Sequence, residues 1–312
     1  MIPWTKAVQR YLTLRRGFGF KLEYPGQALA DFACFLNRRA ATHITVPLAL
    51  QWARGQSPGH GAVHAAQRLS MVRGFARFCH ADDPRTEIPP AQLLPFCAQR
   101  ARPYLYSARE IRSLLAAALR LDPNDALRRW TYHGLFGLLA VSGLRLGEAR
   151  GLRLGDIDWR AGVLTIRGTK FGQSRLVPLH PTTTKVLHAY YSRRSRYFGR
   201  HPTSDYLFVS KRGNRVDGGE ARRVFYRISR QVGLRGATVS HGPRLHDFRH
   251  RFAVATLVRW YRTGVDPERQ IQILSTYLGH IHVADTYWYL TLCPALRGAA
   301  IKRLEKRWSQ FP

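Results

Sequence analysis

Several polar side chains between residues 246 and 289 have the types that phosphate chemistry requires. His246 and Arg249 are three residues apart, so they project from one face of a helix, and His280 precedes Tyr287 and Tyr289. A guanidinium group matches the oxygens of a phosphate, and a histidine exchanges protons near neutral pH. A phenol has a pKa of about 10 and needs cationic surroundings to react. The pattern raises the question whether these groups converge on one site, and whether that site handles phosphate.

Two further candidates lie in turns earlier in the chain. Arg145 follows Gly143, which can adopt the left-handed conformation that reverses a chain after a helix. Glu148 is three residues beyond Arg145 and can steady it, although an ordinary surface Arg–Glu pair is the alternative. Lys170 lies in the turn of a predicted hairpin, where it could donate a proton or contact a phosphate. A solvent-exposed loop lysine is the alternative there.

The charge of the chain indicates a polyanionic partner. Its 312 residues include 50 Lys and Arg, 43 of them Arg, against 19 Asp and Glu, which gives a formal net charge of +31. A charge this large repels itself unless a polyanion neutralises it, and nucleic acid is the usual partner. A GC-biased genome would explain arginine in place of lysine, but not the shortage of acidic residues.

The cysteines and apolar segments bear on the compartment. The four cysteines are scattered without a C-x-x-C pair, which favours a reducing compartment over a disulfide framework or a cysteine-based zinc site. The N-terminus lacks an apolar segment of signal-peptide type, and the longest apolar run, around residues 134–144, is far shorter than a membrane span. We therefore expect a soluble, cytoplasmic protein without a membrane partner.

A proline-rich stretch separates two regions of the chain. A helical N-terminal DNA-binding domain, a linker, a second domain and a basic amphipathic tail helix are expected at residues 1–82, 83–105, 106–293 and 294–312. In the first domain, helical spacing is clearest at residues 28–41, after Pro25-Gly26, and at residues 62–79. Up to Pro103 the chain has 14 basic and 5 acidic residues, so both regions are basic. This suggests two domains clamped around a duplex.

The second domain mixes helical and strand periodicities. Ser107 and Glu110 form a capping box that starts a helix to about Leu121. Strands at 162–167 and 175–179 flank the turn with Lys170, and Pro178 marks an edge strand. Other elements are expected as helices at 125–141, 182–197, 219–232, 246–263, 268–278 and 285–290, and a short strand at 207–209. The predicted fold class is mainly α with a small antiparallel β-sheet.

Two basic helices are candidates for contacts with a DNA backbone. Their arginines are Arg68, Arg73 and Arg77 in residues 62–79, and Arg222, Arg223, Arg227 and Arg230 in residues 219–232. The second set is spaced so that most of its members share one side of the helix. A solvated helix face is the alternative interpretation in both cases.

The motifs resemble those of the tyrosine site-specific recombinases, also called the phage integrase family. In chain order they are Ser142–Glu148, Lys170, His246-x-x-Arg249, Leu278-Gly279-His280 and Tyr289. They are similar to the family's first arginine box, hairpin lysine, second box, third box and nucleophile. Tyr289, nine residues after His280, fits the nucleophile's spacing better than Tyr287. The resemblance covers the second domain, an α+β catalytic domain, whereas the N-terminal region resembles a core-binding domain only in size, helicity and charge.

The resemblance implies a covalent mechanism of DNA cleavage. Tyr289 attacks a phosphodiester, forms a 3′-phosphotyrosyl link and releases a 5′-hydroxyl. Arg145 and Arg249 bind the non-bridging oxygens, where charge develops in the transition state, and His280 donates a further hydrogen bond. Two arginines can fill the role of a metal ion, so no metal is expected.

Other side chains handle protons and orientation in the implied mechanism. Lys170 protonates the departing 5′ oxygen, His246 assists proton transfer to or from Tyr289, and Glu148 orients its neighbours. No cofactor is expected, and the sequence has no phosphate-binding G-x-x-x-x-G-K-[ST] loop. A second 5′-hydroxyl can attack the link and join new strands. The family does this as a tetramer on a specific site in double-stranded DNA, for integration, excision or transposition of mobile elements.

Four other interpretations of the sequence remain. His246-Asp247-x-x-His250 superficially matches a zinc metalloprotease helix, with Asp in place of Glu. Asp156 and Asp158 could belong to a metal nuclease, although a role in the loop after a helix is the alternative. A type IB topoisomerase shares the catalytic groups but relaxes DNA as a monomer. A DNA-binding module without activity is the fourth interpretation, which the intact tyrosine and arginines argue against.

Overall fold

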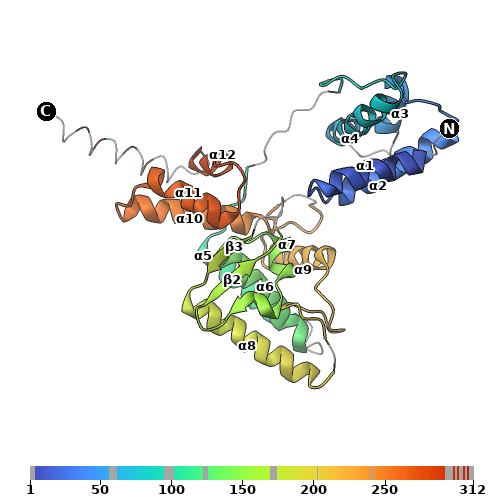
Figure 1. Cartoon of the computed structure of the whole chain (residues 1–312). Coiled ribbons are helices and arrows are strands. Elements are labelled where there is room, and N and C mark those ends of the chain that lie inside the picture. The colour runs from blue at the N-terminus through green and yellow to red at the C-terminus, as the bar shows by residue number, and fades with distance from the viewer. Residues whose placement is uncertain are drawn as a thin grey trace. The chain divides into compact units, whose positions relative to one another are not determined.

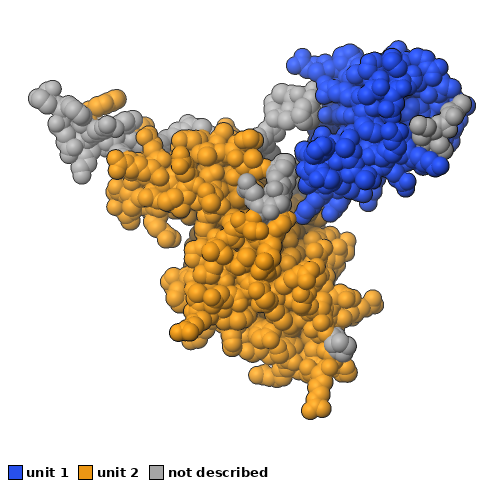
Figure 2. Space-filling model, viewed as in Figure 1, with its two compact units in different colours: residues 1–101 blue, residues 102–312 orange. Residues whose placement is uncertain are grey.

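The computed structural model describes residues 4–55, 62–94, 102–121, 126–168, 174–201, 203–239 and 242–291, with residues 298, 301, 305 and 308. The chain divides into unit 1, Met1–Ala101, and unit 2, Arg102–Pro312 (Figure 2). The division falls inside the predicted linker, whose halves belong to different units. Leu94 is buried in the core of unit 1, whereas Leu105 packs against a core cluster of unit 2. The predicted tail, residues 294–312, lies almost entirely outside the described residues.

Four helices build the described part of unit 1 around an aromatic core. They are α1 (Trp4–Gly17), α2 (Glu23–Arg38), α3 (Val46–Arg54) and α4 (Ala62–Asp82). Phe32, Leu36 and Phe75 are fully buried between them. The prediction that Pro25 precedes the second helix is wrong. Pro25 lies in the first turn of α2, where its missing N–H has no intrahelical partner to lose.

Unit 2 combines helices with one small sheet (Figure 1). Its elements in chain order are α5 (Ala108–Leu119), α6 (Ala126–Ser142), α7 (Leu146–Gly151), η1 (Leu154–Asp156), β1 (Ile157–Asp158), β2 (Val163–Ile166), β3 (Arg175–Pro178), α8 (Pro181–Phe198), α9 (Gly218–Gln231), α10 (Asp247–Arg262), α11 (Pro267–Leu278), α12 (Ala284–Tyr287) and η2 (Trp288–Thr291). The predicted capping box starts α5, since Ser107 Oγ accepts from the Glu110 N–H and the Glu110 carboxylate accepts from the Ser107 N–H. The expected class, mainly α with a small antiparallel sheet, is confirmed.

The sheet has the strand order β1-β2-β3 and is antiparallel throughout. Leu164 pairs with Val177, and both are fully buried. Pro178 lies on the edge strand β3, where its lack of an N–H costs no ladder bond. The prediction of a strand at 207–209 is wrong. This segment forms only an isolated bridge, Val209 to Arg215, within the described residues.

Two apolar clusters organise unit 2. The larger surrounds Phe136, Phe225 and Phe248 and joins α5, α6, α9 and the sheet. The smaller lies where α10 and α11 run side by side, and it includes Leu257 and the tyrosine at position 289. Among the described residues, no helix combines the length and apolar character needed to cross a membrane.

Candidate active site

A tight turn after α6 aims Arg145. Gly143 has φ +62°, and a Cβ there would lie 2.8 Å from Cδ1 of Phe252. Ser142 Oγ donates to Leu138 O at 2.6 Å, so this side chain binds a carbonyl in the last turn of α6. Arg145 then caps α7, and its backbone N–H and Nη1 both donate to the Glu148 carboxylate at 2.9 Å. The backbone and the side chain of Arg145 are therefore fixed by one carboxylate.

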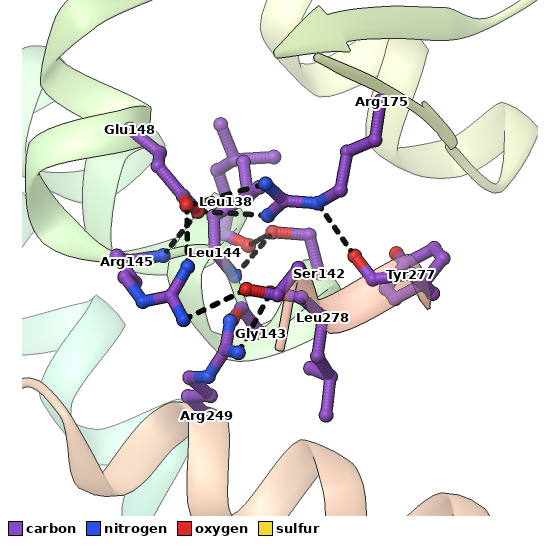
Figure 3. Close-up of polar contacts among 11 residues, drawn as sticks. Leu138, Ser142, Gly143, Leu144, Arg145, Glu148, Arg175, Arg249, Tyr277 and Leu278 are labelled. Atoms are coloured by element: carbon purple, nitrogen blue, oxygen red, sulfur yellow. Dashed lines mark hydrogen bonds and ion pairs between the residues drawn. The ribbon is translucent and has the colours of Figure 1, made fainter. Parts of the chain in front are cut away.

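Three arginines form hydrogen bonds with the C-terminal end of α11 (Figure 3). Arg175 Nε donates to Tyr277 O at 2.7 Å, Arg249 Nη2 to Leu278 O at 2.6 Å and Arg145 Nη2 to Gly279 O at 3.0 Å. Three consecutive carbonyl groups thus each accept from a different arginine. The carbonyls at a helix C-terminus carry partial negative charge, so this end of α11 holds cations favourably. Hereafter these three arginines and Glu148 are called the arginine cluster.

Arg175 is a member of the cluster that the sequence motifs did not reveal. It binds Glu148 with both Nη atoms, at 3.2 Å to Oε1 and 2.8 Å to Oε2, and its side chain is only 8% exposed. The available signal was strand alternation. Arg175 lies two residues before the apolar Val177, so the two share a face, and that face is buried.

Charge in the arginine cluster is unbalanced. Burial acts to raise the pKa of Glu148, but bonds from Arg175 and the charges of Arg175 and Arg145 outweigh it and lower that pKa, so the carboxylate is ionised. Three guanidinium groups therefore face a single carboxylate. Arg249 is 1% exposed, and among the residues that the structure describes it forms no ion pair. Burial, together with repulsion from Arg145, lowers the pKa of Arg249 to about 10.

His246 stands beside this charge at the start of α10. Its ring meets that of His250 edge to face, with 4.7 Å between centroids. Part of the imidazole reaches solvent, yet the protein around it and the charge of Arg249 lower the pKa of His246 to about 4. The neutral imidazole is thus favoured at neutral pH, the form that can accept a proton.

The two tyrosines occupy different environments. Tyr289 is 2% exposed, and its ring stacks on His280 with 6.1 Å between centroids and 18° between planes. His280 is fixed by a 2.7 Å hydrogen bond between Nδ1 and Oγ1 of the fully buried Thr286. Tyr287 is 47% exposed. The structure therefore brings Tyr289 together with His280, while Tyr287 lies at the surface.

The structure brings together five predicted site residues and one supporting residue. Arg145, Glu148, Arg249 and His280 converge around the end of α11. His246 and Tyr289 each interact electrostatically with Arg249. Lys170, which falls between β2 and β3 in the sequence, lies outside the described residues.

The predicted DNA contact at Arg68 is wrong as a surface contact. Arg68 is 5% exposed, donates to Asp31 and to Trp52 O, and stacks 3.5 Å from the centroid of a Trp52 ring. It lies four residues before Val72, on the buried stripe of α4, so it braces the core of unit 1. Arg73 is half-buried and donates to the carbonyls of residues 89 and 90, whereas Arg77 is exposed.

The basic face of α9 is on the surface. All four of its predicted DNA-binding arginines are exposed, and they are Arg222, Arg223, Arg227 and Arg230. Arg223 pairs with Glu220 at 3.0 Å. Successive residues of a helix are about 100° apart, so the four lie within one side of α9.

The carboxylates considered for metal chemistry have structural partners. Asp156 accepts from Arg167 at 2.7 Å and from the Arg153 N–H at 3.0 Å. Asp158 accepts from two backbone N–H groups in the turn after β1. Asp247 of the protease-like motif is buried and accepts from Arg244 through its backbone and side chain. No cluster of three potential metal ligands occurs among the described residues.

Comparison with known proteins agrees with this geometry. Residues 106–294 match the phage integrase family. The chain is 57% identical, over 99% of both chains, to a protein of Sinorhizobium fredii that bears the provisional name integrase/recombinase y4rB. It is 32% identical to tyrosine recombinase XerD of Mycobacterium tuberculosis, over 76% of this chain and 72% of that protein.

Solved structures share the fold. The integrase of transposon Tn1549, in complex with transposon right end DNA, aligns with a TM-score of 0.66 at 17% identity and covers 96% of this chain and 98% of its own. A lambda integrase tetramer bound to a Holliday junction aligns with a TM-score of 0.59 at 19% identity, covering 91% and 76%. With the family match over most of unit 2, these findings show that the chain belongs to the phage integrase family, the tyrosine site-specific recombinases.

Proposed function

We propose that this chain cleaves and rejoins double-stranded DNA at a specific site through a covalent link between Tyr289 and a 3′ phosphate. The observation that carries the proposal is the unbalanced arginine cluster. Arg145 and Arg175 share one carboxylate, Arg249 has none among the described residues, and the cluster adjoins His280, on which Tyr289 stacks. A phosphodiester brings the missing negative charge, and fixed guanidinium donors stabilise the charge that develops on its non-bridging oxygens.

The proposed cleavage step assigns one role to each group. Tyr289 Oη forms a bond to phosphorus while the bond from phosphorus to the 5′ oxygen breaks. The phenolic proton passes to His246, whose neutral form is favoured at neutral pH, and the 5′ oxygen takes a proton from Lys170. A bound phosphate places a negative charge beside His246, which raises the pKa of its imidazole and improves it as an acceptor. A second 5′-hydroxyl reverses the step and joins a new strand.

The relatives support a role in moving DNA elements. One is named an integrase/recombinase, and similar folds include a transposon integrase and a lambda integrase tetramer on a Holliday junction. We propose integration, excision or transposition of a mobile element, carried out in the cytoplasm by a tetramer on DNA. The exposed arginines of α9 and Arg77 are proposed to contact the phosphate backbone. No feature of the described residues favours DNA relaxation by a monomer.

A trapping experiment tests the proposal. Covalent complexes with genomic DNA from the encoding cell, formed in EDTA and sequenced, define the cleaved site. A duplex of that site with a nick next to the scissile phosphate then accumulates the adduct, because the released fragment diffuses away. We expect the adduct with the unaltered protein and with Tyr287→Phe, and none with Tyr289→Phe. Absence of any covalent complex with the unaltered protein would contradict the proposal.

A further inference from the structure

Arg175 makes a hydrogen bond inside the protein with each of its guanidinium nitrogen atoms. Its three nitrogen atoms donate to Tyr277 O, Glu148 Oε1 and Glu148 Oε2 (Figure 3). The side chain is 8% exposed, whereas that of Arg145 is 34% exposed. Two of its donor nitrogen atoms pair with a carboxylate, whereas the printed bonds of Arg249 run only to backbone carbonyls. We therefore expect Arg175 to act on the chemistry through its partners and not by binding a DNA phosphate itself.

One of those partners is shared with a predicted phosphate-binding arginine. Glu148 Oε1 accepts from Nη1 of both Arg145 and Arg175, and Oε2 accepts from the Arg145 backbone N–H and from Arg175 Nη2. A buried ion pair adds little net stability compared with apolar side chains of similar volume. Its clearest consequence here is orientation, because Arg175 fixes the carboxylate that fixes Arg145.

The other partner is the backbone turn that leads to His280. Arg175 Nε holds Tyr277 O, one residue before the carbonyl that Arg249 binds. Gly279 follows with φ +68°, and a Cβ there would lie 2.7 Å from Arg175 Nη1. Arg175 therefore packs directly on the backbone of this turn. One side chain joins strand β3, the start of α7 and the end of α11.

We propose that Arg175 is a positioning residue of the recombinase site, which holds Arg145 and the Gly279-His280 turn in the geometry that binds the scissile phosphate. The proposal rests on the proposed function of the site. Arg175 also follows Lys170 by five residues in the sequence, so the alternative is an effect through the leaving-group acid. The observed bonds run to Glu148 and α11, and they assign the effect to the phosphate side.

Modified substrates separate the two routes. The assay uses the nicked duplex of the mapped site in three forms, and follows the rate of adduct formation at saturating protein. The first form has the natural phosphodiester. The second has a methylphosphonate, in which a neutral methyl group replaces one non-bridging oxygen, so less charge needs stabilisation. The third has a 5′-bridging sulfur, whose thiolate leaves without a general acid.

The matched control is another buried arginine of unit 2. Arg194 is 4% exposed and donates to Thr203 Oγ1 and Ser204 O, with no bond to the arginine cluster. On the natural duplex, Arg175→Met is expected to form adduct roughly 10- to 100-fold more slowly than the unaltered protein, and Arg194→Met at the unaltered rate. The deficit of Arg175→Met shrinks on the methylphosphonate and persists on the bridging sulfur. Arg175→Lys, which retains charge without the two-pronged contact, gives an intermediate rate.

Three results would overturn the inference. Arg175→Met could react like Arg194→Met on the natural duplex. Its deficit could shrink on the bridging sulfur instead of the methylphosphonate, which would assign Arg175 to the leaving-group side. The deficit could also be equal on all three substrates, which would reduce Arg175 to support of the fold. Failure of the unaltered protein on every substrate would instead refute the proposed function.

A measurement without DNA tests the positioning itself. Hydrogen bonds from Nη1 and Nη2 of Arg145 slow rotation of its guanidinium group, so we expect its NMR resonances to be resolved in the unaltered protein. We expect these resonances to shift and broaden in Arg175→Met and to remain in Arg194→Met. Unchanged Arg145 resonances in Arg175→Met would contradict the inference whatever the protein does to DNA.

Discussion

Two buried arginines, one in each unit, show how differently the same side chain can be used. Arg68 in α4 is 5% exposed, and Arg249 in α10 is 1% exposed. Arg68 meets the carboxylate of Asp31 and lies over the Trp52 ring. Arg249 meets two backbone carbonyls and the repelling charge of Arg145, and its pKa falls to about 10. Burial alone does not mark a functional arginine. Arg249 differs from Arg68 because it has no carboxylate partner among the described residues and is repelled by Arg145, a combination that a bound anion would relieve.

Replacement of Arg249 should slow DNA cleavage with little effect on stability, whereas replacement of Arg68 should lower stability without slowing cleavage. Arg249→Met is expected to slow adduct formation roughly 10²- to 10³-fold, because the variant lacks a fixed donor to the developing charge. Its free energy of unfolding should change by about 1 kcal/mol or less, since the removal of two hydrogen bonds and the relief of a buried charge oppose each other.

Arg68→Met is the counterpart. Its adduct rate at saturating protein should equal that of the unaltered protein, and unit 1 should become roughly 1–2 kcal/mol less stable without the stacked cation. Adduct kinetics and thermal unfolding of both variants check the pair. A loss of cleavage in Arg68→Met that matches that of Arg249→Met would remove the distinction.

The turn at Gly279 tests whether the site depends on the backbone that carries it. Gly279→Ala adds left-handed strain and a Cβ 2.7 Å from Arg175 Nη1, so we expect adduct formation to slow roughly tenfold. Gly264→Ala is the control, because Gly264 has φ +75° with no atom within 4 Å of the added Cβ. If both variants cleave equally well, the contact with Arg175 does not matter.

Exposed arginines should differ from the buried pair in their response to salt. Replacing Arg222, Arg227 and Arg230 of α9 by Gln is expected to weaken binding to duplex DNA. The slope of log K against log salt should become shallower by about 0.9 for each phosphate that the variant no longer neutralises. Arg68→Gln should leave the slope unchanged. Fluorescence anisotropy over a salt series measures both, and an unchanged slope in the α9 variant would exclude that face from the DNA interface.

The pKa of His246 should respond to the charge of Arg249, and this is the smallest of the expected effects. NMR should place its midpoint well below the ordinary 6.5, towards about 4, and Arg249→Met should raise it because a repelling charge is removed. The folded-state pKa lies below the unfolded value. The contribution of His246 to stability is therefore present above pH 6.5 and is lost as the pH falls towards 4. A midpoint of 6.5 in both proteins would show that Arg249 does not act on His246.

Local patterns in the sequence predicted much of the fold. The capping box at Ser107, the hairpin with Pro178 on its edge and the long helices depend on neighbours in the chain, which spacing reveals. The elements that the sequence did not predict correctly pair with distant parts of the chain or are very short. Strand β1 has two residues, and the segment at 207–209 pairs only through a single bridge. Pro25 misled because proline is compatible with the first helical turn.

The same difference between local and distant partners decides which residues of the site the sequence predicted. Arg145 and Glu148 were predictable because they are three residues apart in one turn. Arg175 was not, because its partner Glu148 is 27 residues away and a strand arginine is ordinarily exposed. The error at Arg68 had a visible warning, since Val72 and Phe75 follow it at four and seven residues, the spacing of a core stripe.

We expect that the tyrosine stacked on His280, and not the exposed Tyr287, carries the DNA. The direct measurement is mass spectrometry of the trapped adduct after digestion with protease and nuclease. We expect a nucleotide attached through a 3′ phosphate to Tyr289. Attachment to Tyr287, or to any residue other than Tyr289, would contradict it.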